Sequence, residues 1–167
     1  MGRAKKKIEK KKKQAETKSG SATVAQNRKA RFDYKLGKDI LAGMVLEGSE
    51  VKSLRLGNVQ LRGAFAKIIK GEVWLFNCHI AEYEFANQFN HDPDRPKKLL
   101  LNAYEIERLE HELKTTNQTL VATKVFFKKN FAKVNLSLAE GKKKADKRDT
   151  LKKRSQELDI KRATDRY

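Results

Sequence analysis

The residue types that most often carry catalysis or bind metal ions are few in this sequence, and their spacing suits neither task. The histidines His79, His91 and His111 form no HExxH pair, and the lone Cys78 cannot supply a zinc knuckle. Cys78 and His79 are neighbours, so on a strand they point to opposite faces and cannot act as a nucleophile and its base. Phosphate-cradling GxxxxGK and dinucleotide-binding GxGxxG motifs do not occur. The sequence therefore predicts a binding protein rather than an enzyme, with no cofactor.

A magnesium site in the long polar loop Glu82–Pro96 is the one catalytic alternative. Its potential ligands are Glu82, Glu84, His91, Asp92 and Asp94. Loops of this length are usually functional or poorly ordered, but acidic residues around prolines are more often turn formers and caps. We expect no metal site here, and keep a metal-dependent RNA-processing enzyme as a hypothesis for experiment to exclude.

Basic residues dominate the composition and gather at the two ends of the chain. There are 39 Lys and Arg residues against 21 Asp and Glu residues, a formal net charge of +18. Residues 1–18 hold nine basic and two acidic residues, and residues 141–167 hold eleven and five. Such an excess favours polyanionic partners, and phosphate contacts of this kind are independent of sequence and sensitive to salt. Nucleic acid is the favoured partner, with solvated tails as the alternative interpretation of both ends.

A membrane partner and export are not expected. No apolar run approaches the ~18 residues that span a bilayer, and Ile8 is the one large apolar residue in the lysine-rich segment 1–18. Mitochondrial presequences are usually rich in arginine, whereas this segment is nearly all lysine and contains Glu9 and Glu16. A single cysteine excludes an internal disulfide and fits a reducing cytosol. We expect a cytoplasmic monomer.

The segment Gly48–Leu61 (GSEVKSLRLGNVQL) is the strongest local pattern. Val51 and Leu54 lie three residues apart, so a single helical turn could bury both. The residues then expected to point outward, as cationic and hydroxyl donors, are Lys52, Ser53 and Arg55. A short amphipathic connector with solvated charges is the equal alternative.

Alternating apolar and polar residues predict six or seven short strands. The segments are 30–36, 40–46, 64–70, 73–80, 97–101, 119–127 and 131–138. Turns are expected at Gly37-Lys38, at Gly71-Glu72 and at 128–130. Asn102 is expected to cap a helix that ends near Leu113, since Glu105 completes a capping box. The expected fold class is mainly β with flanking helices, as a small closed or partly open antiparallel β-barrel.

This pattern divides the chain into three parts. Residues 1–20 form a basic disordered arm, residues 21–140 a single barrel domain, and residues 141–167 a basic tail. The tail has good helix formers and few large aliphatic residues, so its helix should be marginal in water. We expect it to form when phosphates neutralise its charge.

Four stretches of the sequence resemble, in order and spacing, the signature of the SsrA-binding (small protein B) family. They are GSATVAQNRKARFDY, AGMVLEGSEVKSLRLGNVQL, NHDPDRPKKLLLN and AEGKKKADKRDTLKKR, and the resemblance runs from about residue 19 to the end. It implies an oligonucleotide-binding-type barrel that binds the tRNA-like part of transfer-messenger RNA and enters stalled bacterial ribosomes for trans-translation. It also implies that the tail becomes a helix in the empty messenger channel and contacts the decoding centre. Alanyl-tRNA synthetase and elongation factor Tu are implied as indirect partners.

The resemblance assigns expected roles to particular residues. Asn27, Leu100 and Asn102 match positions tied to RNA binding. Further matched positions in the RNA-binding motifs are Lys29, Arg31, Tyr34, Glu50, Lys52, Ser53, Arg55, Lys97 and Lys98. The tail positions expected at the ribosome are Lys142, Lys143, Lys144, Asp146, Lys147, Arg148, Lys152, Lys153 and Arg154. These residue types suit RNA, because Lys and Arg hold phosphates, Asn can read a base edge and Tyr can stack on an unpaired base.

Three positions depart from the family pattern. Leu41 stands where many members carry a glutamate implicated in RNA contact, and Phe32 and Ala145 stand where histidines are usual. The departure at Leu41 concerns the RNA interface. The departure at Ala145 implies that stacking at the decoding centre is supplied by another residue or is not needed. A general ribosomal or structural RNA-binding protein, which the charge alone would permit, is the alternative function.

Overall fold

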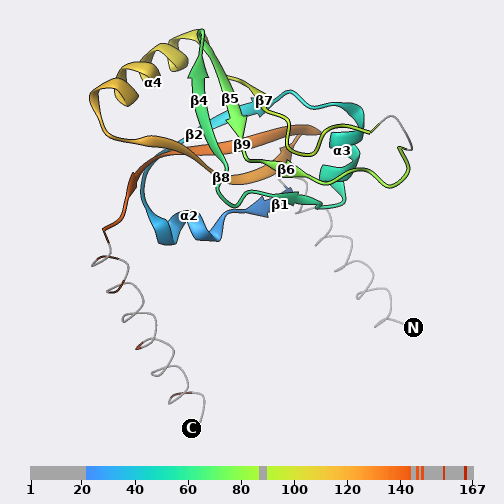
Figure 1. Cartoon of the computed structure of the whole chain (residues 1–167), viewed down its shortest axis with the longest axis horizontal. Coiled ribbons are helices and arrows are strands. Elements are labelled where there is room, and N and C mark those ends of the chain that lie inside the picture. The colour runs from blue at the N-terminus through green and yellow to red at the C-terminus, as the bar shows by residue number, and fades with distance from the viewer. Residues whose placement is uncertain are drawn as a thin grey trace, which may run out of the picture.

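The computed structural model of the chain describes residues 22–86, 90–143, 146, 148, 156 and 164. The strands are β1 (Ala22–Gln26), β2 (Tyr34–Met44), β3 (Val59–Gln60), β4 (Phe65–Ile69), β5 (Glu72–Phe76), β6 (His79–Ile80), β7 (Lys97–Leu100), β8 (Thr119–Lys128) and β9 (Phe131–Gly141). The helices are α2 (Arg28–Asp33), α3 (Gly48–Arg55) and α4 (Ala103–Thr115) (Figure 1). The predicted fold, mainly β with a few helices, is confirmed.

The strand pairings of the larger sheet form a ring that starts and ends at β8, with β1 paired to β8 outside the ring. The order is β1-β8-β4-β5-β7-β2-β9, and β9 pairs again with β8, every pairing being antiparallel. In this closed ring the neighbours β4 and β8 stand opposite the neighbours β7 and β2. The outer faces of these two strand pairs therefore point in opposite directions.

The interior of the ring is filled by the alternate residues of its strands. Val73 and Leu75 of β5, Leu120 of β8 and Leu136 of β9 are fully buried, as the period of two in a strand requires. Leu109 is the buried residue of α4, which lies at the upper left in Figure 1. This packing leaves the intervening residues of each strand facing outward.

The prediction of a strand over residues 30–36 is right for residues 34–36, which begin β2, and wrong for residues 30–33. Residues 28–33 form α2, because the Asn27 side chain caps the helix and its Oδ1 accepts a hydrogen bond from the backbone N–H of Ala30, 3.0 Å away. The predicted turn at Gly37-Lys38 is also absent from the described chain. Instead β2 runs through it, with a shift of register between Leu36 and Asp39 that marks a bulge.

Other local predictions are confirmed, some with shifted boundaries. The capping box of Asn102 and Glu105 opens α4, and the helical turn around Val51 is part of α3. The β4–β5 hairpin turns at Lys70 and Gly71, one residue earlier than predicted, where φ is 51° and 76°. Both residues adopt the left-handed backbone that a two-residue hairpin turn of this kind demands.

Candidate nucleic-acid interface

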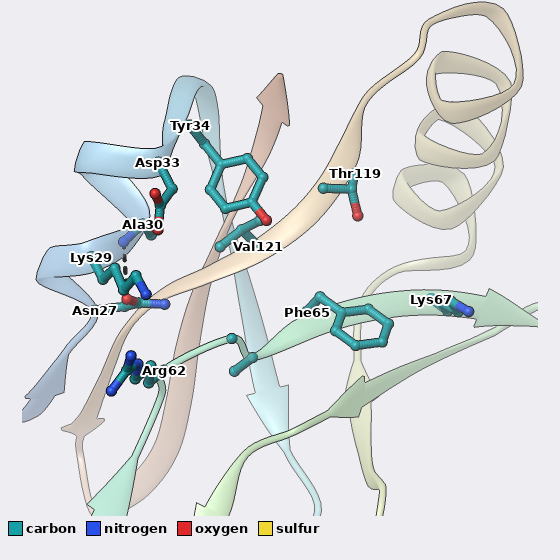
Figure 2. Close-up of a pocket in the computed structure, with 12 residues that line it drawn as sticks. Asn27, Lys29, Ala30, Asp33, Tyr34, Arg62, Phe65, Lys67, Thr119 and Val121 are labelled. Carbon is teal, nitrogen blue, oxygen red and sulfur yellow. Dashed lines mark hydrogen bonds between the residues drawn. The ribbon is translucent and has the colours of Figure 1, made fainter. Parts of the chain in front are cut away.

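A hollow of about 620 Å³ opens between α2 and the beginnings of β4 and β8 (Figure 2). It is lined by Asn27, Lys29, Ala30, Asp33, Tyr34, Arg62, Gly63, Ala64, Phe65, Lys67, Thr119 and Val121. In Figure 2, Lys29 and Arg62 lie at one end of it and Lys67 at the other, beyond Phe65. Exposed basic side chains beside half-buried aromatic rings suit a phosphate and a base.

The Asn27 side chain fastens α2 to the strands. Its Nδ2 donates to the backbone oxygens of Leu61 at 2.7 Å and Ala122 at 3.1 Å, while its Oδ1 caps the helix. Both amide hydrogens are therefore used inside the protein, and the side chain is buried. Asn27 places the neighbouring Lys29 and Tyr34 at the hollow, which differs from the expected reading of a base edge.

The basic tail begins at the wall of this hollow. Tyr34 pairs with Gly141 at the end of β9. The backbone N–H of Lys142 then donates to the oxygen of Asp33, and its ammonium donates to the oxygen of Arg31, both at 3.0 Å. A cation that satisfies carbonyls at the C-terminal end of α2 also suits the helix dipole. The hollow and the start of the tail are thus parts of one surface.

Glu50 and Lys97, together with the partly exposed Arg95, form a buried charge cluster beneath α3. Glu50 and Lys97 are fully buried, and Arg95 pairs with Glu50 through its Nη2. The ammonium of Lys97 donates to the oxygens of Cys78 at 2.7 Å and Pro93 at 2.8 Å, and lies 3.9 Å from Glu50 Oε1. Two of the predicted RNA-binding residues, Glu50 and Lys97, therefore hold Pro93 and Arg95 beside α3 and β7 and do not reach a surface.

Burial perturbs the protonation of this cluster. Desolvation lowers the pKa of Lys97 below its ordinary value. Desolvation also raises the pKa of the neighbouring Cys78 thiol to about 11, although the charge of Lys97 opposes that shift. The thiol is therefore protonated near neutral pH, as expected of an inert buried cysteine.

The residues of α3 divide between the interior and the surface. The predicted outward orientation of Ser53 is wrong, because its hydroxyl is fully buried and donates to the oxygen of Ala81 at 2.6 Å. Lys52 and Arg55 are exposed as expected, with their charged ends 5.4 Å and 5.8 Å from the ring centroids of Tyr83 and Phe127.

The predicted residues Lys98 and Leu100 lie on the outer face of β2 and β7, which we define by Leu41, Gly43, Lys98 and Leu100. Leu41 and Leu100 are 42% and 56% exposed, which is unusual for leucines on adjoining strands. They come together because Gly43 pairs with Leu100. A side chain at Gly43 would place its Cβ 3.3 Å from that of Leu100, so the close approach favours glycine. The exposed Asn102 lies two residues after the end of β7.

Two of the side chains considered as magnesium ligands, those of His91 and Asp94, make contacts within the protein. His91 is buried, with Nδ1 3.0 Å from the Ser49 hydroxyl and Nε2 3.0 Å from the oxygen of Ile80. Asp94 lies 3.0 Å from the Nδ1 of His79. In the part of the chain that the structure describes, no group of three or more His, Cys, Asp or Glu side chains could hold a metal ion. No helix within the described residues is long and apolar enough to cross a membrane.

Several predicted positions of the tail fall outside the described residues. They are Lys144, Lys147, Lys152, Lys153 and Arg154, together with Ala145 and the arm 1–20. Asp146 and Arg148 are described as helical, and Lys143 is exposed. The division of the chain into arm, barrel domain and tail stays a prediction.

Sequence reasoning missed two cations of the hollow, Arg62 and Lys67. Lys67 could have been found, because it is the exposed residue between Ala66 and Ile68 in a strand that was expected. Arg62 gave no local signal, since it stands between strands and reaches the hollow through the tertiary fold.

Comparison with known proteins agrees with this architecture. The family model described as SmpB protein matches residues 24–166. The SsrA-binding protein of Streptococcus pyogenes serotype M3 (strain ATCC BAA-595 / MGAS315) is 51% identical over 144 residues, which is 86% of this chain and 93% of that protein. That of Streptococcus mutans serotype c is 52% identical over 139 residues, 83% of this chain and 90% of that protein. A solved chain from "tmRNA-SmpB: a journey to the center of the bacterial ribosome" is 45% identical, with a TM-score of 0.61 over 72% of this chain and 85% of that one. The family resemblance seen in the sequence is confirmed, and the chain belongs to the SmpB protein family.

Proposed function

We propose that this protein binds the tRNA-like domain of transfer-messenger RNA (SsrA RNA) and escorts it to stalled ribosomes for trans-translation. The observation that carries the proposal is the 51% identity to an SsrA-binding protein over 86% of the chain. The described surface supports it, because the exposed cations Lys29, Arg62 and Lys67 line the hollow and the partly exposed Lys98 lies on the opposite side of the strand ring. The function is binding, without a catalytic step or a cofactor.

The tRNA-like domain rests on the outer face of β2 and β7. Leu100 and Asn102, which match family positions tied to RNA binding, stand there beside Leu41 and Lys98. Lys98 supplies a cation for a phosphate, and the exposed leucines supply apolar contact with sugars and base edges. Leucine at position 41 makes this contact less polar than the usual glutamate would.

The hollow and the tail face the ribosome. Lys142 anchors the start of the tail to α2 beside the hollow, so a tail helix in the empty messenger channel would bring Lys29 and Arg62 against ribosomal RNA. The basic tail, residues 141–167, forms a helix there and contacts the decoding centre through Asp146, Lys147 and Arg148. Ribosomal phosphates offset the charge repulsion that makes this helix marginal in water.

The strand ring acts as an oligonucleotide-binding-type barrel in this scheme, in the bacterial cytoplasm. Alanyl-tRNA synthetase and elongation factor Tu then meet the protein indirectly, as proteins that handle the same RNA. These assignments follow from the family resemblance, and the RNA-specificity experiment described next also tests them.

A competition assay at moderate salt tests the RNA specificity. Labelled transfer-messenger RNA bound to the full chain is displaced with unlabelled transfer-messenger RNA or with an elongator tRNA. We expect the tRNA to compete much more weakly, since phosphate contacts alone would not tell the two apart. Equal competition would favour the general RNA-binding alternative, which also predicts equal binding to stalled and unstalled ribosomes.

A chain ending at Glu140 separates the two tasks. We expect it to bind transfer-messenger RNA as tightly as the full chain at moderate salt, and to fail in peptide tagging on stalled ribosomes. Normal tagging by this shortened chain would contradict the role of the tail.

A further inference from the structure

The outer face of β4 and β5 carries aromatic rings that the core does not use. Val73 and Leu75 of β5 are fully buried, so the alternate residues Trp74 and Phe76 point outward, where both are half-buried. The strand register sets Phe65 of β4 opposite Phe76. Their rings are stacked, with centroids 5.7 Å apart and planes 20° apart.

Lysines flank Trp74 on both sides. Trp74 pairs with Lys67 of β4 and with Lys98 of β7, so the three residues form one row across the outer face. The ammonium of Lys67 lies 5.5 Å from the centroid of the Phe65 ring. Lys98 pairs with Glu72, and its side chain is 38% exposed. Cations thus alternate with aromatic rings at the spacing of neighbouring strands.

This row is continuous with the hollow. Phe65 and Lys67 belong to both, and Figure 2 shows them on β4 at the end of the hollow away from Arg62. The basic residues of the combined surface are Lys29, Arg62, Lys67 and Lys98, and the acidic ones are Asp33 and Glu72. The surface therefore combines an excess of positive charge with four aromatic rings, those of Tyr34, Phe65, Trp74 and Phe76.

We infer that this surface binds a short unpaired segment of RNA, with bases stacked on Phe65, Trp74 and Phe76 and phosphates at the lysines and Arg62. Every base has a π face, so such a surface accepts any sequence, and its cations follow the backbone. A duplex keeps its bases stacked inside and offers the rings no contact. This goes beyond the proposed function, in which a folded tRNA-like shape is recognised on the outer face of β2 and β7.

The lysine held over Phe65 is compatible with this role. A cation above an exposed ring contributes less than a stacked base does. A base can therefore displace the ammonium of Lys67 from the ring, after which the ammonium pairs with the adjacent phosphate.

The fluorescence of Trp74 reports binding to this surface, because Trp74 is the one tryptophan in the sequence. We expect hexauridylate to quench the fluorescence of the full-length protein in a saturable manner at low salt. A short RNA duplex at the same phosphate concentration should bind through the basic ends of the chain and leave the fluorescence nearly unchanged. Absence of quenching by hexauridylate, or equal quenching by the duplex, would overturn the inference and favour a protein partner for this face.

Phe65→Leu removes the ring and keeps an apolar side chain at a half-buried position. We expect its affinity for hexauridylate to fall about tenfold, while thermal unfolding stays close to that of the parent. Phe131→Ala is the matched control, since Phe131 is 71% exposed at the β8–β9 turn and away from this surface. Parent-like affinity of Phe65→Leu, or an equal loss in Phe131→Ala, would also overturn the inference.

Discussion

Lys97 and Lys98 are neighbours in β7, yet the structure places them in opposite environments. Lys97 belongs to the buried charge cluster, where its ammonium donates to backbone oxygens 2.7 Å and 2.8 Å away. Lys98 stands on the outer face of β2 and β7, where it pairs with the half-exposed Glu72. A motif matched by sequence therefore contains charges of two kinds: those that hold the fold and those that are free to meet a partner.

The buried charges are costly to separate, which is why the two regions should respond differently to substitution. Removing one partner of a buried ion pair leaves the other charge uncompensated, whereas an exposed pair contributes little to stability. The predictions below use this contrast, beginning with the largest effect.

Glu50→Ala should cause the largest loss of stability. It leaves the buried Lys97 without its counter-charge, while the partly exposed Arg95 keeps only Glu47, so we expect the free energy of unfolding to fall by about 3–5 kcal/mol in urea titrations. Lys52→Ala, on the exposed side of the same helix, is the control and should change it by less than about 0.5 kcal/mol. Equal effects of the two substitutions would remove the distinction between the regions.

Asn27→Ala should destabilise the protein by about 2 kcal/mol. It removes the cap of α2 and the amide donor to the oxygens of Leu61 and Ala122, of which the Leu61 oxygen keeps the bond from the Ala64 N–H. Asn27→Ser keeps a capping hydroxyl, so about half of the loss should be recovered in thermal unfolding. If Asn27→Ala leaves stability unchanged but abolishes RNA binding, its side chain acts on RNA directly.

Replacing Lys29 and Arg62 together by alanine should affect binding and spare stability. Both are exposed cations of the hollow. We expect about tenfold weaker binding to the small ribosomal subunit and a salt slope shallower by about 0.7–0.9 per lost phosphate contact. Lys128→Ala, an exposed lysine outside the hollow, serves as the control in the same titrations. An equal loss of binding in Lys128→Ala would show that the net charge matters and the position in the hollow does not.

Comparing the stability of the parent with that of Cys78→Ala at several pH values should show that the Cys78 thiol is buried. The folded thiol, with a pKa of about 11, keeps its proton in a range where the unfolded thiol, with a pKa of 9.0, loses it. Its contribution to stability is therefore complete below pH 9 and is lost as the pH rises toward 11. Between pH 9 and pH 10 the parent should lose about 1 kcal/mol relative to Cys78→Ala in chemical unfolding. A difference in the free energy of unfolding between the parent and Cys78→Ala that stays constant over this pH range would mean that the thiol is not desolvated.

Local sequence signals predicted the elements whose stabilising contacts are local. The capping box at Asn102 and Glu105 identified α4, and the spacing of Val51 and Leu54 identified α3. Residues 30–33 of α2 were misassigned because their short alternation fits a strand, while the helix depends on Asn27 and its bonds to the distant residues Leu61 and Ala122.

The candidate site was also predicted only in part, because contacts between residues distant in the sequence position some of its side chains. Strand alternation sets Lys97 on the face of the buried Leu99 and Lys98 on the face of Leu100, so the sequence contained the signal that one lysine lies inside. The burial of Ser53 had no such signal, because its partner at Ala81 lies 28 residues away. Likewise, the hollow depends on residues of α2, β4 and β8 that the closed ring of strands brings together.

The paired variants Lys97→Met and Lys98→Met test the central distinction most directly, each measured for its free energy of unfolding and its affinity for transfer-messenger RNA. We predict that Lys97→Met loses stability and that its folded fraction binds the RNA like the parent. Lys98→Met should keep the stability of the parent and bind the RNA more weakly. A Lys97→Met protein as stable as the parent but with weakened RNA binding would contradict the assignment of this lysine to the interior.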